Sequence, residues 1–136
     1  SRINAREAVV GFLSNGVHAN GFSLVRRVLE QEDYDGEDLL APTRCYLPEV
    51  RRLRDSAHAF AHVTGGGILG NLTRVLPDAL AADIDWGSWP RPPVFDWLAR
   101  HIDEAELRRV FNLGIGYLAV VPDPGNGLVV GTIVRA

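Results

Sequence analysis

The sequence predicts one domain of the α/β (α+β) class, spanning residues 1–136, in which a mixed β-sheet is packed with helices. Short apolar runs suited to strands alternate along the chain with segments whose apolar side chains recur at helical spacing. A length of 136 residues fits one ordinary domain, and a 46% share of apolar residues suffices for a hydrophobic core.

The first two elements follow from apolar patterning. Ala8 to Leu13 form a short apolar run that ends in a turn-prone Ser-Asn-Gly, which predicts a buried strand. Residues 22–30 place four apolar side chains on one face, which predicts a helix. Asn20 or Ser23 is available to cap its start.

The middle of the chain is organised by proline and glycine. Residues 42–47 are expected to be extended, because Leu47 precedes a proline. Pro48 suits the first position of a short helix over 48–56. A strand is predicted over 58–63, and the glycine-rich segment 64–76 turns directly into a helix.

The last third continues the alternation. Two helices follow a further strand, and Asp103 with Glu106 has the spacing of a capping box. A Pro-Asp-Pro-Gly-Asn turn separates the final two strands. The predicted elements are a strand over 79–85, helices over 92–101 and 103–111, and strands over 116–121 and 127–134.

Composition excludes several classes of protein. A net charge of −3 without a basic tract argues against nucleic-acid binding. The longest apolar runs, such as Leu118 to Val121, are far shorter than the ~20 residues of a membrane-spanning helix. The single cysteine, Cys45, allows no internal disulfide, and it is expected to be a buried or half-buried structural thiol.

The amino terminus carries two further indications. Its first dozen residues lack the pattern of a signal peptide, so a cytoplasmic location is expected. The sequence begins with Ser1 and contains no methionine, which indicates a terminus that was processed, cut or engineered.

Residues 14–21, Ser-Asn-Gly-Val-His-Ala-Asn-Gly, lie between a predicted strand and a predicted helix. Glycines on either side allow the backbone to bring His18 and Asn20 close to a ligand. An ordinary turn with helix-capping side chains explains the same residues equally well.

A second glycine-bearing segment contains Gly65, Gly67 and Gly70 in a G-x-G-x-x-G pattern after a strand and before a helix. Backbone N–H groups in such a place suit a phosphate. Asp85 stands where a dinucleotide fold could place its ribose-binding acid. A dinucleotide site is nevertheless not expected, because the motif lies mid-chain and a tryptophan- and proline-rich loop follows Asp85.

A third segment, Phe-Asn-Leu-Gly-Ile-Gly-Tyr, has Gly114 and Gly116 at a helix-to-strand junction. On spacing alone these glycines are better explained as a helix C-cap and a tight turn than as a binding loop.

Five blocks in order give the chain a resemblance to a known family: GVHANGFSLVRRVL, LLAPTRCYL, AFAHVTGGGILGNLTRVLP, IDWGSWPRPPVFDWL and FNLGIGYLAVV. Together they resemble the carboxy-terminal domain of aminoimidazole ribonucleotide synthetase, the phosphoribosylformylglycinamidine cyclo-ligase. The resemblance extends from about Ala8 to Val121. Sister families that use ATP share the architecture, among them formylglycinamidine ribonucleotide synthetase, selenophosphate synthetase and thiamine monophosphate kinase.

The resemblance implies an ATP-dependent cyclo-ligase of purine biosynthesis, with formylglycinamidine ribonucleotide and ATP as substrates and Mg²⁺ as cofactor. ATP would phosphorylate the formyl oxygen, and an amidine nitrogen would then close the imidazole ring. His18 and Asn20 would be the catalytic polar groups near the amidine. No metal ligand is assigned in this chain. The implied substrate- and phosphate-binding residues are Ser23, His62, Thr64, Gly65, Gly66, Gly67, Asn71 and Asn112.

Some of these roles have competing interpretations. Ser23 contacts a phosphate or caps its helix, and Asn112 contacts a ligand or ends its helix. His62 is a ligand contact or a hydrogen-bonded strand histidine. No general base is assigned, because spacing alone does not place one.

The family's amino-terminal domain, which supplies much of the ATP and Mg²⁺ site and the main homodimer interface, is absent from this sequence. The chain alone is therefore predicted to be inactive. Connections near residues 53–58 and 101–102 and after Pro124 are short for the family, and methionines of the family are replaced by Leu113 and Tyr117. Either loops are missing from this sequence or the chain is compacted. The alternative function is a truncated or engineered non-catalytic binding module, or the equivalent domain of a sister family.

Overall fold

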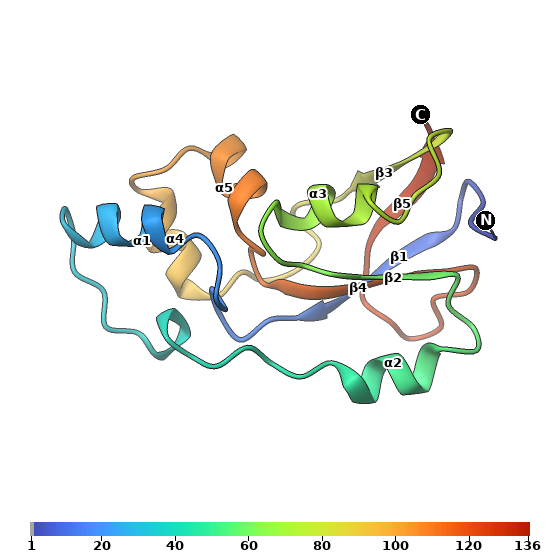
Figure 1. The fold of residues 1–136 in the computed structure, drawn as a ribbon, viewed down its shortest axis with the longest axis horizontal. Helices are drawn as coiled ribbons and strands as arrows, with labels where there is room; N and C mark the ends of the chain where they lie inside the picture. The colour runs from blue at the N-terminus through green and yellow to red at the C-terminus, as the bar shows by residue number, and fades with distance from the viewer. Residues whose placement is uncertain (1) are drawn as a thin grey trace.

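The computed structural model describes residues 2–136 as an α+β fold built on one five-stranded sheet (Figure 1). The strand order is β2-β4-β1-β5-β3, and all four pairings are antiparallel, where a mixed sheet was expected. The strands are β1 (Ala8–Leu13), β2 (Ala59–His62), β3 (Leu80–Ile84), β4 (Ile115–Val121) and β5 (Val129–Arg135).

The five predicted α-helices are also present, each shorter than its sequence pattern. A short 3₁₀ helix that the sequence did not predict lies between α1 and α2. The helices are α1 (Phe22–Leu29), η1 (Glu37–Leu39), α2 (Leu47–Leu53), α3 (Gly67–Thr73), α4 (Pro93–Ala99) and α5 (Glu104–Val110).

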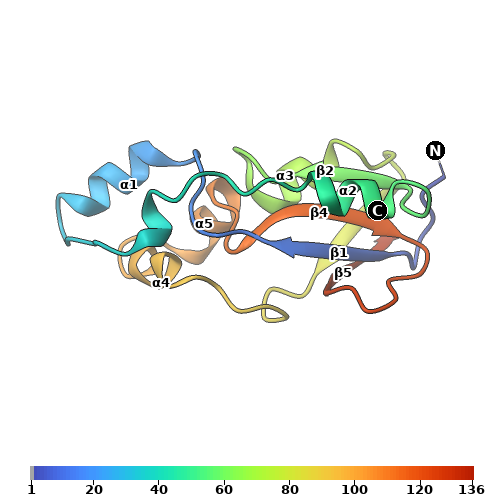
Figure 2. The ribbon, with the colours of Figure 1, turned by 90° about the horizontal axis from the view of Figure 1, so that it is seen from below.

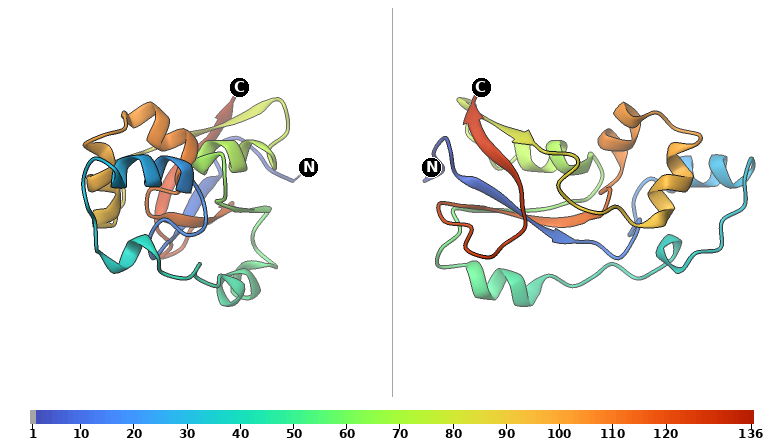
Figure 3. Two further views of the ribbon diagram at one scale, coloured as in Figure 1. Left: turned by 60° about the vertical axis from the view of Figure 1, so that its left-hand side comes forward. Right: turned by 180° about the vertical axis from the view of Figure 1, so that it is seen from behind.

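The two faces of the sheet are covered unequally. One face packs on α3 through the main core, which includes Val9, Leu118 and Ile133, and α5 packs in turn against α3. The other face carries a smaller cluster of Val10, Ala57, Ala119 and Val121, and α2 lies on this side. Figures 1 and 3 show α3 and α2 on opposite sides of the strands.

The helices α1, α4 and α5 gather beyond one end of the sheet. Figure 2 shows β1 and β4 side by side, with α1 and α4 past the end of β1. Trp97, Phe95 and Phe111 are almost fully buried there and belong to the main core.

Local capping agrees with the sequence at one helix and differs at another. The Asp103 side chain accepts a hydrogen bond from the Glu106 N–H at 2.9 Å, so the predicted cap of α5 is confirmed. The expected cap of α1 by Asn20 or Ser23 is wrong. Gly21 holds the N-cap position in the left-handed region, and no side chain bonds to the helix start.

Cys45 is exposed, which corrects the expectation of a buried thiol. In this segment the neighbouring Tyr46 takes the buried position.

Candidate functional site

The sheet brings together two of the three glycine-bearing segments. β1 and β2 flank β4, and both run antiparallel to it. The carboxyl ends of β1 and β2 therefore lie at the same end of the sheet. Residues 14–21 follow β1, and residues 63–66 follow β2. The two segments meet where the Asn20 Oδ1 lies 3.8 Å from the position that a Cβ on Gly65 would take.

Asn112, from the third segment, holds the β1–α1 loop in place. Its Nδ2 donates to the carbonyl oxygens of Gly16 and Val17 at 2.8 and 3.3 Å. Its Oδ1 accepts from the Ser14 hydroxyl and from the Gly114 N–H, both at 2.8 Å. With 3% of its surface exposed, the Asn112 carboxamide supports the loop from within the fold.

His18 occupies an unusual position in this loop. Its backbone has a φ of 60°, in the left-handed region that bulky residues rarely adopt. The imidazole is buried, its Nε2 lies 2.7 Å from the Asn15 Oδ1, and its Nδ1 has no hydrogen-bond partner. Burial lowers the pKa of His18 below its ordinary value of 6.5, and the nearby His62 lowers it further.

Asn71 holds the glycine loop in the same way. Its Nδ2 donates to the carbonyl oxygens of Gly67 at 2.7 Å and Thr64 at 3.2 Å, and its Oδ1 accepts from the Thr64 hydroxyl at 3.0 Å. The carboxamide is therefore occupied within the loop, and Asn71 shapes the place where a phosphate was expected.

The backbone donors of this loop differ in availability. Gly67 donates its N–H to the Thr64 carbonyl at 3.2 Å. Gly65 and Gly66 are exposed, and within residues 2–136 their N–H groups have no acceptor. The N–H groups of Gly65 and Gly66 are therefore free to bind an anion.

His62 adjoins two tyrosines that sequence reasoning did not assign to the site. It is exposed at the end of β2, with ring centroids 6.2 Å from Tyr46 and 5.7 Å from Tyr117. Tyr46 stacks on Tyr117 and donates its hydroxyl to the Leu13 carbonyl at 2.8 Å. A recess of about 370 Å³ adjoins these rings, lined by Arg44, Cys45, Tyr46, Leu47, Val50, His62 and Tyr117.

The contacts among His62, Tyr46 and Tyr117 follow from the pairing register of the strands and from the direction in which the segment before α2 turns. His62 pairs with Tyr117 across β2 and β4, and a Cβ on Gly116 would lie 2.1 Å from the Tyr46 hydroxyl oxygen. Neither relationship follows from spacing in the sequence. Asn15 was also missed, because the Ser-Asn-Gly run was interpreted only as a turn.

Ser23 lies apart from this arrangement. It is exposed in the first turn of α1, and no described contact joins it to the glycine loop. Asp85 follows β3, at the sheet edge opposite β2, and its Oδ1 accepts from the Gly87 N–H.

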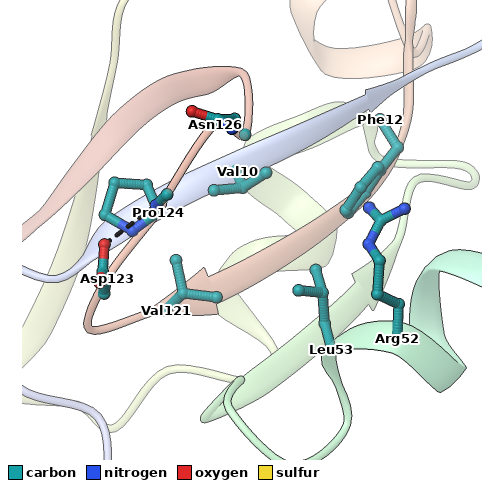
Figure 4. A pocket seen from close by; sticks show the side chains of 10 residues that line it. Val10, Phe12, Arg52, Leu53, Val121, Asp123, Pro124 and Asn126 are labelled. Atoms are coloured by element: carbon teal, nitrogen blue, oxygen red, sulfur yellow. Dashed lines mark hydrogen bonds between the residues drawn. The ribbon is translucent and has the colours of Figure 1, made fainter.

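A separate recess of about 370 Å³ lies on the side of the sheet that carries α2 (Figure 4). Val10 and Phe12 of β1, Leu53 of α2 and the turn after Val121 form its walls. None of the residues expected to bind substrate or phosphate lines it. It is therefore distinct from the candidate site formed by the β1–α1 loop and the glycine loop.

Residues 2–136 hold neither a cluster of metal ligands nor a membrane-spanning helix. No three His, Cys, Asp or Glu side chains converge there as metal ligands would. No helix in this part of the chain has the length and apolar character needed to cross a membrane.

Comparison with known proteins identifies relatives over most of the chain. The chain is 48% identical to a phosphoribosylformylglycinamidine cyclo-ligase of Sorangium cellulosum, with 88% of this chain and 40% of the relative covered. It is 44% identical to the protein of that name from Nitrosococcus oceani, with 89% and 38% covered, and 46% identical to that from Parasynechococcus marenigrum, with 89% and 40% covered.

The chain thus spans about 40% of the length of these relatives. The alignment with the Sorangium protein runs over 139 positions yet includes only 88% of the 136 residues, so the relative has residues within the matched region that this chain lacks. This agrees with the expectation of shortened connections.

A family model described as "AIR synthase related protein, C-terminal domain" matches residues 7–129. The match includes both loops of the candidate site and the turn at Asn112, which supports the loop between β1 and α1. The chain therefore belongs to the AIR synthase related family, as its C-terminal domain.

Proposed function

We propose that the chain is the substrate- and phosphate-binding part of a phosphoribosylformylglycinamidine cyclo-ligase. The whole enzyme would use ATP to convert formylglycinamidine ribonucleotide to aminoimidazole ribonucleotide, with release of ADP and phosphate. The meeting of Asn20 with Gly65 carries this proposal, because the loop that carries His18 and Asn20 lies against a loop with free N–H donors. The names of the relatives support the reaction class.

The geometry suggests which part of the ligand each of the two loops would contact. The free N–H groups of Gly65 and Gly66 would bind the phosphate of the ribonucleotide. Asn20 and His18 would lie toward the formylamidine, and His62 would border it. Thr64, Asn71 and Asn112 would act by holding these loops, since their side chains are engaged within the fold. Ser23 would reach the ligand only from the exposed face of α1.

ATP and Mg²⁺ would be bound largely by the part of the relatives that this chain does not span. In the reaction, ATP would phosphorylate the formyl oxygen, the amidine nitrogen would attack the activated carbon, and phosphate would leave as the ring closes. Assembly of the full-length protein as a homodimer, and its cytoplasmic location, remain predictions. The isolated chain is expected to bind ribonucleotide weakly and to produce no ADP.

Nuclear magnetic resonance of the isotopically labelled chain tests the binding site. Formylglycinamidine ribonucleotide is expected to shift the amide resonances of Gly65 and Gly66, while Gly125 and Gly127 at the separate recess serve as internal references. Ribose 5-phosphate, which lacks the amidine, is expected to shift the glycine amides and to leave the Asn20 side-chain resonances unchanged. Unshifted Gly65 and Gly66 amides at saturating nucleotide would refute the phosphate assignment.

An activity measurement tests the division of labour. ADP formation from ATP and formylglycinamidine ribonucleotide is expected to be undetectable with the chain alone. Robust turnover by the isolated chain would show that the nucleotide-binding machinery lies within these 136 residues.

A further inference from the structure

Asn15 bridges two segments through its side-chain amide. Its Nδ2 donates to the Pro42 carbonyl oxygen at 2.8 Å, and its Oδ1 lies 2.7 Å from the His18 Nε2. The first of these hydrogen bonds orients the amide, because only the NH₂ end can donate to a carbonyl. The oxygen end of Asn15 must therefore face His18.

This orientation determines which imidazole nitrogen carries a proton. An amide oxygen only accepts hydrogen bonds, so the His18 Nε2 must donate and must be protonated. In the neutral imidazole the Nδ1 then carries a bare lone pair. That atom is shielded from solvent and has no hydrogen-bond partner within residues 2–136.

Three further features restrict the position of His18. Asn112 fixes the carbonyl groups of Gly16 and Val17, immediately before His18. The His18 Cε1 lies so close to Gly116 that a Cβ added to this glycine would be only 2.9 Å from it. His18 also holds a left-handed backbone conformation, the kind of local strain that persists when its surroundings enforce it.

We propose that Asn15 is a positioning residue that holds His18 in the Nε2–H tautomer and leaves Nδ1 as the only proton-accepting atom of the ring. His18 would then accept a hydrogen bond or a proton at Nδ1, and a donor such as an amidine N–H reaches it only when neighbouring side chains move aside. The use of this acceptor in catalysis rests on the proposed function. The tautomer and its control by Asn15 do not.

Long-range ¹H–¹⁵N correlation spectra of the chain with ¹⁵N-labelled histidine test the proposal, since each tautomer gives its own pattern of ring couplings. Single His→Gln variants at positions 18, 58, 62 and 101 assign the four histidines. The wild-type His18 is expected to show the Nε2–H tautomer without a detectable Nδ1–H form. In Asn15→Leu, loss of one hydrogen bond is expected to raise the ratio of the Nδ1–H to the Nε2–H form by about fivefold, which makes the Nδ1–H form detectable.

Two further variants keep the test decisive. Asn15→Asp preserves the acceptor, so His18 should keep its Nε2 proton, and the added carboxylate should raise its pKa against the effect of His62. Asn126→Leu, at an exposed turn position, is the matched control and should leave the His18 pattern unchanged. A wild-type His18 in the Nδ1–H form, an unchanged pattern in a folded Asn15→Leu, or an unchanged His18 pKa in Asn15→Asp would overturn the proposal.

Discussion

The side-chain nitrogen of Asn112 lies 2.8 Å from the carbonyl oxygen of Gly16, although 96 positions separate the two residues. The contact ties the turn between α5 and β4 to the loop between β1 and α1. It also explains how a flexible Gly-Val-His-Ala-Asn-Gly sequence acquires a defined shape. The loop's conformation is therefore a property of the assembled fold and is sensitive to single changes at a distance.

Replacing Asn112 with Ala is expected to lower the free energy of unfolding by about 2–4 kcal/mol, because buried polar groups of the loop would lose their partners. Urea denaturation followed by tryptophan fluorescence measures the change. Asn126→Ala, an amide-to-methyl change at an exposed position, should alter stability by less than about 0.5 kcal/mol. Equal midpoints for the two variants would contradict a supporting role for Asn112.

The glycines at 67 and 70 provide a matched pair within α3. A Cβ on Gly67 would lie 2.0 Å from the Arg108 carbonyl oxygen, and its φ is 70°, whereas a Cβ on Gly70 meets nothing within 4 Å. Gly67→Ala is expected to destabilise the fold by about 2–4 kcal/mol. Gly70→Ala should stabilise it by about 0.5–1 kcal/mol through helix propensity. Thermal unfolding of both variants measures the difference, and a stable Gly67→Ala would show that α3 and α5 do not approach so closely.

Asn71→Ala is expected to act locally on the glycine loop. Removal of the bonds to the Thr64 and Gly67 carbonyls should lower the free energy of local opening by about 1–3 kcal/mol. Hydrogen exchange should accelerate over residues 64–73 and stay unchanged in β5. Thr73→Ala, an exposed change on the same helix, is the control. Uniform acceleration along the chain would indicate global destabilisation instead of a local role of Asn71 in holding the glycine loop.

The pKa of His18 is expected to respond to His62 in a defined order. Burial is the larger cause of its lowered pKa, and the charge on His62 is the smaller. In His62→Gln the pKa of His18 should therefore rise, yet stay below 6.5. A pH titration followed through the histidine resonances gives the pKa of His18 in the wild type and in His62→Gln. His101→Gln is the remote control. A return to 6.5 would show that burial contributes little.

The same lowered pKa predicts how stability depends on pH. Because the pKa of His18 is lower in the folded chain than its ordinary 6.5, the unfolded chain binds the proton more readily. The stabilisation is thus present in full above pH 6.5 and is lost as pH falls from 6.5 through the folded pKa. Urea midpoints between neutral and acidic pH should decline less steeply for His18→Gln than for the wild type. Parallel curves would contradict a neutral, buried His18.

Local patterns in the sequence were sufficient for the strands and the α-helices of the fold, although not for the short 3₁₀ helix η1. The apolar run Ala8–Leu13 became the central strand, and the Asp103–Glu106 spacing became a working cap, because both depend on residues a few positions apart. The cap of α1 was mispredicted because the start of this helix depends on a contact between residues that are far apart in the sequence. Its loop is held by Asn112 across the sheet, so the side chains of Asn20 and Ser23 are not needed at the helix start.

Family membership, the alternation of strands and helices, and the positions of the His18 loop and the glycine loop along the chain all follow from sequence patterns. Which polar groups of these loops remain available depends on the folded arrangement. Asn71 and Asn112 are used up in holding loops, Gly65 and Gly66 keep free donors, and Asn15 selects the protonated nitrogen of His18. The physical reason is that a hydrogen bond consumes a donor and an acceptor, and its partner is chosen by proximity in space, which strand pairing sets across long stretches of chain.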